Sequence, residues 1–207
     1  MIETFLFDLG NVLVRFSHER MCAQIGALCG RSSAEMRRLL IDSQLQWEFE
    51  RGKLTEQEFH QRLQKVVAHS LELQELVHAG SDIFELNSPV VPIVETLRAR
   101  GHRLVLLSNT SISHFEFVSR NFDILRHFDD FVLSYEVGAL KPEGTIFHEA
   151  LKKIQCPPER CFYTDDIPEY VAAGRTHGLQ AEVFTTAEAL AGHLSQRGIT
   201  LPQTAKP

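Results

Sequence analysis

Short runs of apolar, β-branched and aromatic residues recur along the chain, and segments with helical spacing separate them. The runs cover residues 2–7, 103–108, 131–134, 161–164 and 181–185. Short apolar runs predict buried strands, and their alternation with helices predicts βαβ units. The expected fold class is therefore α/β, a doubly wound parallel sheet with helices on its faces.

Two of the helical segments have clear beginnings. After Ser88, Pro89 suits a first helical position, and an apolar face follows until Gly101 ends the helix. Pro142 is expected to open another helix, in which apolar residues recur at helical spacing up to Ile154.

Residues 17–86 follow a different pattern, with several helical stretches and no convincing strand. In one stretch, Thr55 and Glu58 form a capping box ahead of an apolar stripe. We therefore expect an all-helical cap at 15–86, inserted after the first strand of a core made of residues 1–14 and 87–200. The cap is either an appendage or a cover for a ligand site at the end of that strand. The tail, 201–207, is expected to be disordered.

Composition narrows the possible partners. The net charge is −6 and no Lys/Arg cluster is present, which argues against nucleic-acid binding. No run approaches the roughly 20 apolar residues that cross a bilayer, and no basic leader precedes the first apolar run. The four cysteines lack C-x-x-C spacing, which is typical of reduced thiols. We expect a cytoplasmic monomer or homodimer.

Polar residues stand at the ends of the predicted strands, and they are Asp8, Ser108, Asn109, Lys141, Asp165 and Asp166. Taken singly, each has an ordinary alternative as a helix cap, a turn residue or a solvated lysine. In an open parallel sheet, however, the carboxyl ends of all strands face one crevice. These groups are therefore expected to converge.

The chemistry that such a group allows is phosphoryl transfer. Carboxylates that share a crevice raise one another's pKa values unless a cation lies among them, and oxygen ligands suit Mg²⁺. Main-chain N–H groups at a helix N-terminus suit a phosphate, and a lysine supplies a point charge to its oxygens. Asp8 is then the natural nucleophile, giving an aspartyl-phosphate that water hydrolyses.

In this order and spacing, the residues resemble the four motifs of the haloacid dehalogenase superfamily, over residues 8–169. The stretch "WEFERGKLTEQEF" at 47–59 is similar to a recurrent part of the family's cap. "DDIPEYVAAG" at 165–174 resembles the commoner D-D-x-P-E-N-V form, with Tyr170 in place of asparagine.

The resemblance implies a Mg²⁺ ion held by Asp8, the main-chain carbonyl of Gly10 and Asp166. Asp165 would lie adjacent or act through water, and Glu169 is a further candidate for the metal shell. The resemblance also implies how the phosphate is bound: by Ser108, by the backbone of Asn109, and by Lys141 bridging it to Asp8.

Gly10 departs from the pattern of most phosphatases of this family, which carry a second Asp two residues after the nucleophile. That side chain protonates the leaving alcohol and then activates water, and losing such a group costs about 10²–10⁴ in rate. Three interpretations are open: a metal-independent 2-haloacid dehalogenase, a catalytically impaired protein that binds a ligand or protein, and a phosphatase without this acid. Asp165 and Asp166 together would be idle in a dehalogenase.

"FDLGNVLV" resembles bacterial phosphatases of the α-D-glucose-1-phosphate phosphatase type, which carry the same glycine and are active. We therefore expect a Mg²⁺-dependent phosphatase for small phosphorylated metabolites, with sugar phosphates as the expected substrates. His18 and Glu19 are the nearest cap residues that could supply the missing proton, unless both merely open a surface helix.

Overall fold

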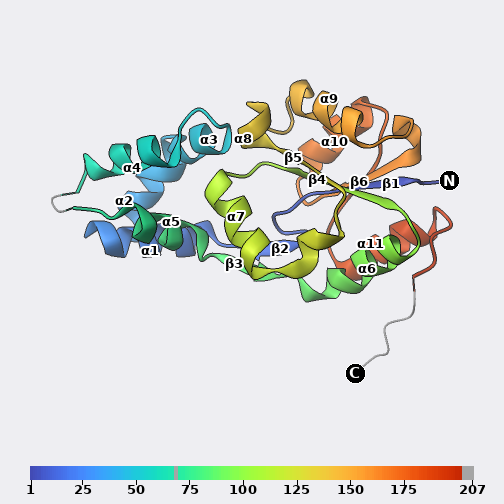
Figure 1. Ribbon diagram of the computed structural model, residues 1–207, viewed down its shortest axis with the longest axis horizontal. Helices are drawn as coiled ribbons and strands as arrows, with labels where there is room; N and C mark the ends of the chain where they lie inside the picture. Colours follow the sequence, from blue (N-terminus) through green and yellow to red (C-terminus); the bar gives the residue numbers. More distant parts are fainter. Residues whose placement is uncertain (68–69, 202–207) are drawn as a thin grey trace.

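The computed structural model describes residues 1–67 and 70–201, so all but the first residue of the predicted tail lies outside the described residues (Figure 1). A parallel sheet of order β5–β4–β1–β6–β7 forms the core and confirms the predicted α/β class. Its strands are β1 (Thr4–Phe7), β4 (Arg103–Ser108), β5 (Asp130–Leu133), β6 (Cys161–Asp165) and β7 (Gln180–Val183).

Helices cover both faces of this sheet, with α6 and α11 on one side and α9 and α10 on the other (Figure 1). The helices of this part of the chain are α6 (Val91–Ala99), α7 (Ile112–Asn121), α8 (Ser134–Val137), α9 (Gly144–Lys153), α10 (Pro168–Thr176) and α11 (Ala187–Ser195). Short 3-10 turns lie at η2 (Ser88–Val90), η3 (Asp123–His127) and η4 (Pro158–Arg160).

The predicted start of α9 at Pro142 is wrong by two residues, because the helix begins at Gly144. The backbone of Lys141 makes its hydrogen bonds to the side chain of Asn109 rather than within the helix. The chain therefore remains in a turn through Pro142 and turns helical only after it.

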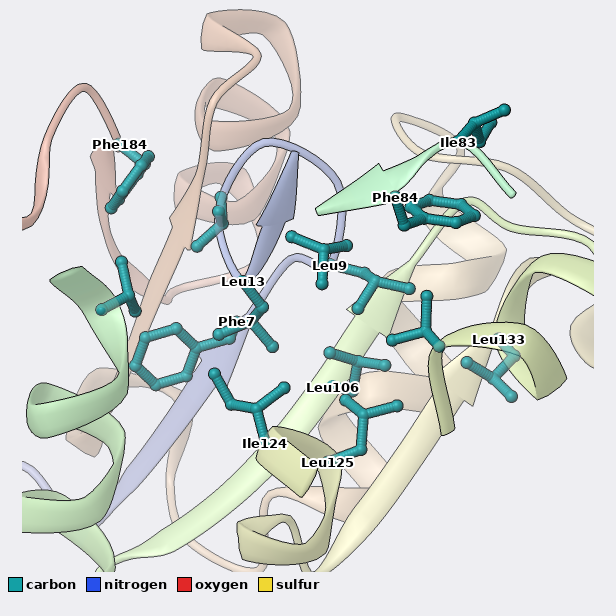
Figure 2. Close-up of a cluster of buried hydrophobic side chains, with 14 of the residues drawn as sticks. Phe7, Leu9, Leu13, Ile83, Phe84, Leu106, Ile124, Leu125, Leu133 and Phe184 are labelled. Atoms are coloured by element: carbon teal, nitrogen blue, oxygen red, sulfur yellow. The ribbon is translucent and has the colours of Figure 1, made fainter. Parts of the chain in front are cut away.

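Side chains of the central strands alternate between two apolar layers. In β1, Phe7 packs with Leu106 of β4 and Leu133 of β5 in one layer, and Leu6 belongs to the other. Figure 2 shows the first layer, which reaches from η3 past the sheet to Phe84. Alternation on both faces is expected of a sheet covered on both sides.

An all-helical region follows β1 and lies beyond the carboxyl ends of the sheet, as expected for a cap (Figure 1). It contains α1 (His18–Cys29), α2 (Ser33–Arg37), the π-helical turn η1 (Arg38–Asp42), α3 (Leu45–Glu50), α4 (Glu56–Gln64) and α5 (Leu73–Ser81). The predicted capping box is confirmed, because Thr55 Oγ1 accepts from the Glu58 N–H and the Glu58 carboxylate accepts from the Thr55 N–H.

The prediction that residues 17–86 hold no strand is wrong at their end. There β3 (Phe84–Leu86) pairs antiparallel with β2 (Val14–Phe16), and this ribbon carries the chain out of the core and back. Strands of three residues are too short to establish a period of two in the sequence. Their pairing depends on the two ends of the insertion meeting in space.

The cap touches the core tightly at the loop after α3. Gly52 has φ +71°, and a Cβ built on it would lie 2.1 Å from the carbonyl oxygen of Tyr135. Beside it, the Arg51 guanidinium binds both carboxylate oxygens of Glu143, at 2.8 and 2.5 Å. The backbone approach needs a glycine, and the ion pair fixes the same loop to the turn that precedes α9.

All four cysteines are free thiols; Cys22, Cys29 and Cys161 are buried, and Cys156 is half-buried. Over the described ranges, no helix combines the length and apolarity needed to span a membrane.

The contact at Gly52 predicts a specific loss of stability. Gly52→Ala should cost about 1–3 kcal/mol more unfolding free energy than Gly30→Ala, because its methyl group collides with a backbone oxygen. Gly30 also has positive φ, +63°, but has open space around it, so it controls for conformation alone. Urea unfolding measures both. Equal losses would show that the loop does not press against Tyr135.

Candidate active site

The register of the sheet brings Asp8 and Asp165 side by side. Phe7 pairs with Leu106 of β4 and with Thr164 of β6, and the Asp8 N–H continues the ladder by donating to the Thr164 carbonyl at 3.0 Å. Asp8 and Asp165 are the next residues after Phe7 and Thr164, so they lie next to each other at the carboxyl ends of β1 and β6.

Lys141 lies between these two carboxylates. Its ammonium donates to Asp8 Oδ1 at 2.7 Å, to Asp165 Oδ2 at 2.6 Å and to the Leu107 carbonyl at 3.1 Å. Lys141 is only 3% exposed. Burial alone would lower the pKa of its ammonium, but the contacts with Asp165 and Asp8 outweigh burial and raise this pKa above its usual value. The buried lysine is therefore charged.

The side chain of Asn109 holds Lys141 in place. Its Oδ1 accepts from the Lys141 N–H at 2.7 Å, and its Nδ2 donates to the Lys141 carbonyl at 3.1 Å. The ammonium also lies 5.2 Å from the ring centre of Tyr170. The family resemblance implies a role for the Asn109 backbone only, so this contact of its side chain was not predicted.

Asp8, Asp165 and Asp166 place one carboxylate oxygen each within 4.8 Å of the others. Burial raises the pKa of Asp8 to about 7, although Lys141 opposes this rise. Burial also raises the pKa of Asp166, whose Oδ2 accepts from Asn11 Nδ2 at 3.0 Å. One ammonium does not balance three carboxylates, and clustered oxygens of this kind are the donor set that Mg²⁺ prefers.

Asp165 and Asp166 differ in what their carboxylates do. Asp165 is fully buried, and protein donors occupy both of its oxygens: Lys141 and the Tyr163 hydroxyl at Oδ2, and the Ile167 N–H at Oδ1. Asp166 is half-buried and lines a cavity. Asp166 therefore faces the space in which a ligand can bind, whereas Asp165 positions Lys141.

The cavity lies between the strand ends and the cap and measures about 170 Å³. The residues proposed from sequence that line it are Asp8, Gly10, Ser108, Asn109, Lys141, Asp166 and His18. Asp165 lies behind this wall, and Glu19 and Glu169 are exposed residues that do not line it. Other lining residues were not proposed from sequence, and they include Phe16, Trp47, Glu50, Phe84, Thr110, His114 and Tyr170.

Ser108 ends β4 at the wall of this cavity. The simple alternative, that residues 108–110 cap the next helix, does not hold, because the N-cap of α7 is Ser111, whose Oγ accepts from the His114 N–H. The Ser108 hydroxyl makes only a long contact, 3.4 Å, to the Asn109 carbonyl. It is well placed to exchange that contact for a ligand oxygen.

The ring of Phe16 occupies the space beside Gly10. A Cβ built on Gly10 would lie 2.8 Å from Phe16 Cε1 and 3.2 Å from Cδ1. That ring is itself packed, with its centre 5.0 Å from the ring of His18 and 6.2 Å from that of Phe84. The ring of Phe16 therefore fills the space that a side chain at position 10 would occupy.

Glu50 is an acidic residue on the cap side of the cavity that was not predicted from the sequence. The available signal was its pairing with Gln46: the two stand at i and i+4 on the buried face of α3, beside Leu45 and Phe49. A polar pair on an otherwise apolar helix face marks a site that either pairs internally or binds a ligand.

The fold and this site together define a class: doubly wound α/β proteins with a helical region inserted after the first strand and a carboxylate–lysine site at the strand ends. The chain matches the haloacid dehalogenase-like hydrolase family over residues 2–178. It therefore belongs to that family.

Curated relatives include proteins of different activity. The chain is 27% identical to the D-ribitol-5-phosphate phosphatase of Bacteroides thetaiotaomicron, over 87% of this chain and 90% of that one. It is 35% identical to the glyceraldehyde 3-phosphate phosphatase of Methanothermobacter thermautotrophicus, over 50% of this chain and 47% of the other. It is also 27% identical to drimenol cyclase drtB of Aspergillus calidoustus, over 89% of this chain, but spans only 34% of that protein.

Solved structures share the fold over nearly the whole chain. A HAD family enzyme from Bacteroides thetaiotaomicron superposes with a TM-score of 0.82 at 21% identity, covering 93% of this chain and 98% of that one. The wild-type enzyme in complex with magnesium and inorganic phosphate gives a TM-score of 0.75 at 22% identity, covering 90% and 96% of the two chains.

The contact between Gly10 and Phe16 predicts strong coupling between the two positions. Gly10→Asp should lower the unfolding free energy by about 1–3 kcal/mol, because the new side chain needs the volume of the ring. In the Phe16→Ala background the same change should cost much less. A double-mutant cycle in urea measures the difference. Additive effects would contradict the packing at Gly10.

Burial of His114 predicts a loss of stability in acid. Burial lowers its pKa to about 4, and its Nε2 lies 3.1 Å from the Gly80 carbonyl. Because the unfolded chain binds a proton near pH 6.5 and the folded chain does not, stability is present above that pH and is lost as the pH falls toward 4. Between pH 7 and pH 5 this amounts to about 2 kcal/mol.

Urea unfolding of the wild type and of His114→Asn at both pH values isolates this contribution. The variant is expected to lose about 2 kcal/mol less than the wild type over that interval. An equal pH dependence in the two proteins would show that His114 titrates normally.

Proposed function

We propose that the protein is a Mg²⁺-dependent phosphatase that hydrolyses small phosphorylated metabolites through an aspartyl-phosphate on Asp8. The observation that carries this proposal is the buried Lys141 ammonium between Asp8 and Asp165, with Asp166 facing the same cavity. A reactive carboxylate, a fixed cation and a second carboxylate that faces the same cavity are the groups that phosphoryl transfer requires.

In this proposal each residue has its own role. Asp8 attacks phosphorus, and Lys141 holds both the nucleophile and the oxygens of the phosphate. The Ser108 hydroxyl and the backbone N–H of Asn109 bind the remaining phosphate oxygens. Asp165 acts indirectly, because its carboxylate is taken up by Lys141, Tyr163 and Ile167.

The metal ion would be held by Asp8, Asp166 and the main-chain carbonyl of Gly10. When bound, Mg²⁺ supplies positive charge to the phosphate oxygens and offsets the carboxylate cluster. The carboxylates fit such an ion because they outnumber the one buried ammonium. Asn11, which bonds Asp166, would orient that ligand.

Sugar phosphates and related polyol phosphates are the proposed substrates. Relatives named as phosphatases of D-ribitol 5-phosphate and of glyceraldehyde 3-phosphate support this class. The cavity also mixes the rings of Trp47, Phe16 and His18 with polar groups, which suits a small hydroxylated ligand. The first-motif resemblance to glucose-1-phosphate phosphatases points the same way.

The further proposals follow from this function. We propose that residues 15–86 act as a cap that closes over the cavity, on a core made of 1–14 and 87–200. We also propose a cytoplasmic monomer or homodimer, because substrates of this kind are intracellular metabolites and the cysteines are free thiols.

Phosphate release from a panel of sugar and polyol phosphates tests the function. The wild type should release phosphate with Mg²⁺ and not with EDTA, and Asp8→Asn should lose essentially all activity, because an amide is not a nucleophile here. Asp123→Asn, a change at an exposed residue that does not line the cavity, is the matched control. Halide release from 2-haloacids that persists in EDTA would instead identify a dehalogenase. Ligand binding without any turnover would identify a binding protein.

A further inference from the structure

Gly10 has no acidic side chain, so the proton for a leaving alcohol has to come from another residue that lines the cavity. Besides the groups assigned above to nucleophile, metal and phosphate, the proton-exchanging side chains that line the cavity are His18, Glu50, His114 and Tyr170. His18 and Glu50 lie on the cap helices α1 and α3. His114 and Tyr170 lie on the core helices α7 and α10.

Two of these side chains are poor proton donors, His114 because of its bonding and Tyr170 because it is a weak acid. The neutral ring of His114 commits its Nε2 to the Gly80 carbonyl, which leaves only an acceptor nitrogen. The Tyr170 hydroxyl accepts from Asn109 at 3.4 Å, and burial raises its already high pKa. For His18, burial and the nearby Arg37 lower the pKa, so its ring is largely neutral at pH 7.

Glu50 is the candidate that the geometry holds most firmly. It is the last residue of α3, it is 5% exposed, and its Oε1 accepts from Gln46 Nε2 at 3.0 Å. Its main-chain carbonyl accepts from the Ser134 hydroxyl at 2.6 Å. Ser134 also accepts from the Thr110 N–H at 2.9 Å, so the end of α3 is tied to the segment that follows β4.

The second carboxyl oxygen of Glu50 is available to a ligand. Among the described residues, Gln46 is the side chain that hydrogen-bonds the Glu50 carboxyl group, at Oε1, and no cation pairs with it. A buried carboxyl group without a cationic partner is stable only if it can be protonated or can bond a ligand. Both conditions suit a group that gives and takes a proton.

We propose that Glu50 is the catalytic acid–base that replaces the side chain absent at Gly10. This inference rests on the proposed phosphatase function. Phe16 fills the space beside Gly10, and the cap residue Glu50 supplies a carboxyl group to the same cavity.

The proton balance of the two steps is complete with Glu50 alone. Asp8 forms a bond to phosphorus as the bond from phosphorus to the leaving oxygen breaks, and that oxygen takes the proton of Glu50. Water then attacks phosphorus and gives a proton to the Glu50 carboxylate, and the bond to Asp8 breaks. The ester and water become alcohol and phosphate, and both side chains return to their starting forms.

The charge state of Glu50 agrees with these two roles. Burial raises its pKa to about 7, with the Gln46 amide opposing the rise and the charge of Asp8 adding to it. At neutral pH both its acidic and its basic forms are therefore populated, as a general acid–base requires. The other titratable groups that face the cavity are Asp8, His18, His114, Lys141, Asp166 and Tyr170.

A series of leaving groups tests the assignment. Glu50→Gln should lower kcat/KM for benzyl phosphate about 100-fold or more, because an alcohol leaves poorly without a proton, and should change it little for p-nitrophenyl phosphate. With p-nitrophenyl phosphate the variant should also show a burst of p-nitrophenol and then slow turnover, because its second step lacks a base. Glu50→Asp should restore part of the loss.

Glu48→Gln is the matched control, because Glu48 lies on the same helix, pairs with Arg62 at 2.7 Å and does not line the cavity. It should behave as the wild type does. In the wild type itself, kcat/KM for benzyl phosphate should fall as the pH rises above about 7, since Glu50 then loses its proton, while kcat/KM for p-nitrophenyl phosphate should not.

A folded Glu50→Gln protein with the leaving-group dependence of the wild type would overturn the assignment. If that variant does not fold, equal pH profiles of the wild type on the two esters would overturn it. A wild type that releases phosphate from neither these esters nor any metabolite would overturn the proposed function, and the role of Glu50 with it.

Discussion

The contact on which the site depends is the buried ion pair between the Lys141 ammonium and the carboxylates of Asp8 and Asp165. A charge removed from water is stable only when it is paired and hydrogen-bonded. The turn before α9, which carries Lys141, therefore has to lie against the strand ends that carry Asp8 and Asp165. Two hydrogen bonds from the side chain of Asn109 to the Lys141 backbone help to hold the lysine in this position. The arrangement fixes the orientation of Asp8 before any ligand arrives, which is the form of preorganisation that favours nucleophilic catalysis.

The second constraint is the seat of the cap. Gly52 touches the Tyr135 carbonyl, Arg51 pairs with Glu143, and the Ser134 hydroxyl bonds the Glu50 carbonyl. The end of α3 and the two residues after it are therefore held to the core, and this contact brings Glu50 to the cavity. At the other wall, Phe16 fills the space that a side chain at position 10 would need. Phe16 thus occupies the space beside Gly10, and the proposed acid, Glu50, reaches the cavity from the cap.

Much of the fold and of the core half of the site could be predicted from the sequence. Parallel strands with short apolar runs define one edge, and polar residues at that edge converge because the geometry of the sheet leaves them no alternative. The cap half could not be predicted, because Glu50 meets Ser134 across 84 residues and Arg51 meets Glu143 across 92. Nothing local in the sequence encodes such docking. The short ribbon of β2 and β3 could not be predicted for a related reason, since its two strands pair only when the two ends of the insertion meet in space.

The central claim is that phosphorus passes through the carboxylate of Asp8, and trapping that adduct tests it most directly. Rapid acid quench of a single turnover with a ³²P-labelled sugar phosphate, followed by peptide mapping, shows where the label resides. The account predicts label on the peptide that contains Asp8, stable in acid and released by hydroxylamine, as an acyl phosphate requires. Label on another residue, or phosphate formed throughout the turnover with no labelled protein at any quench time, would contradict it.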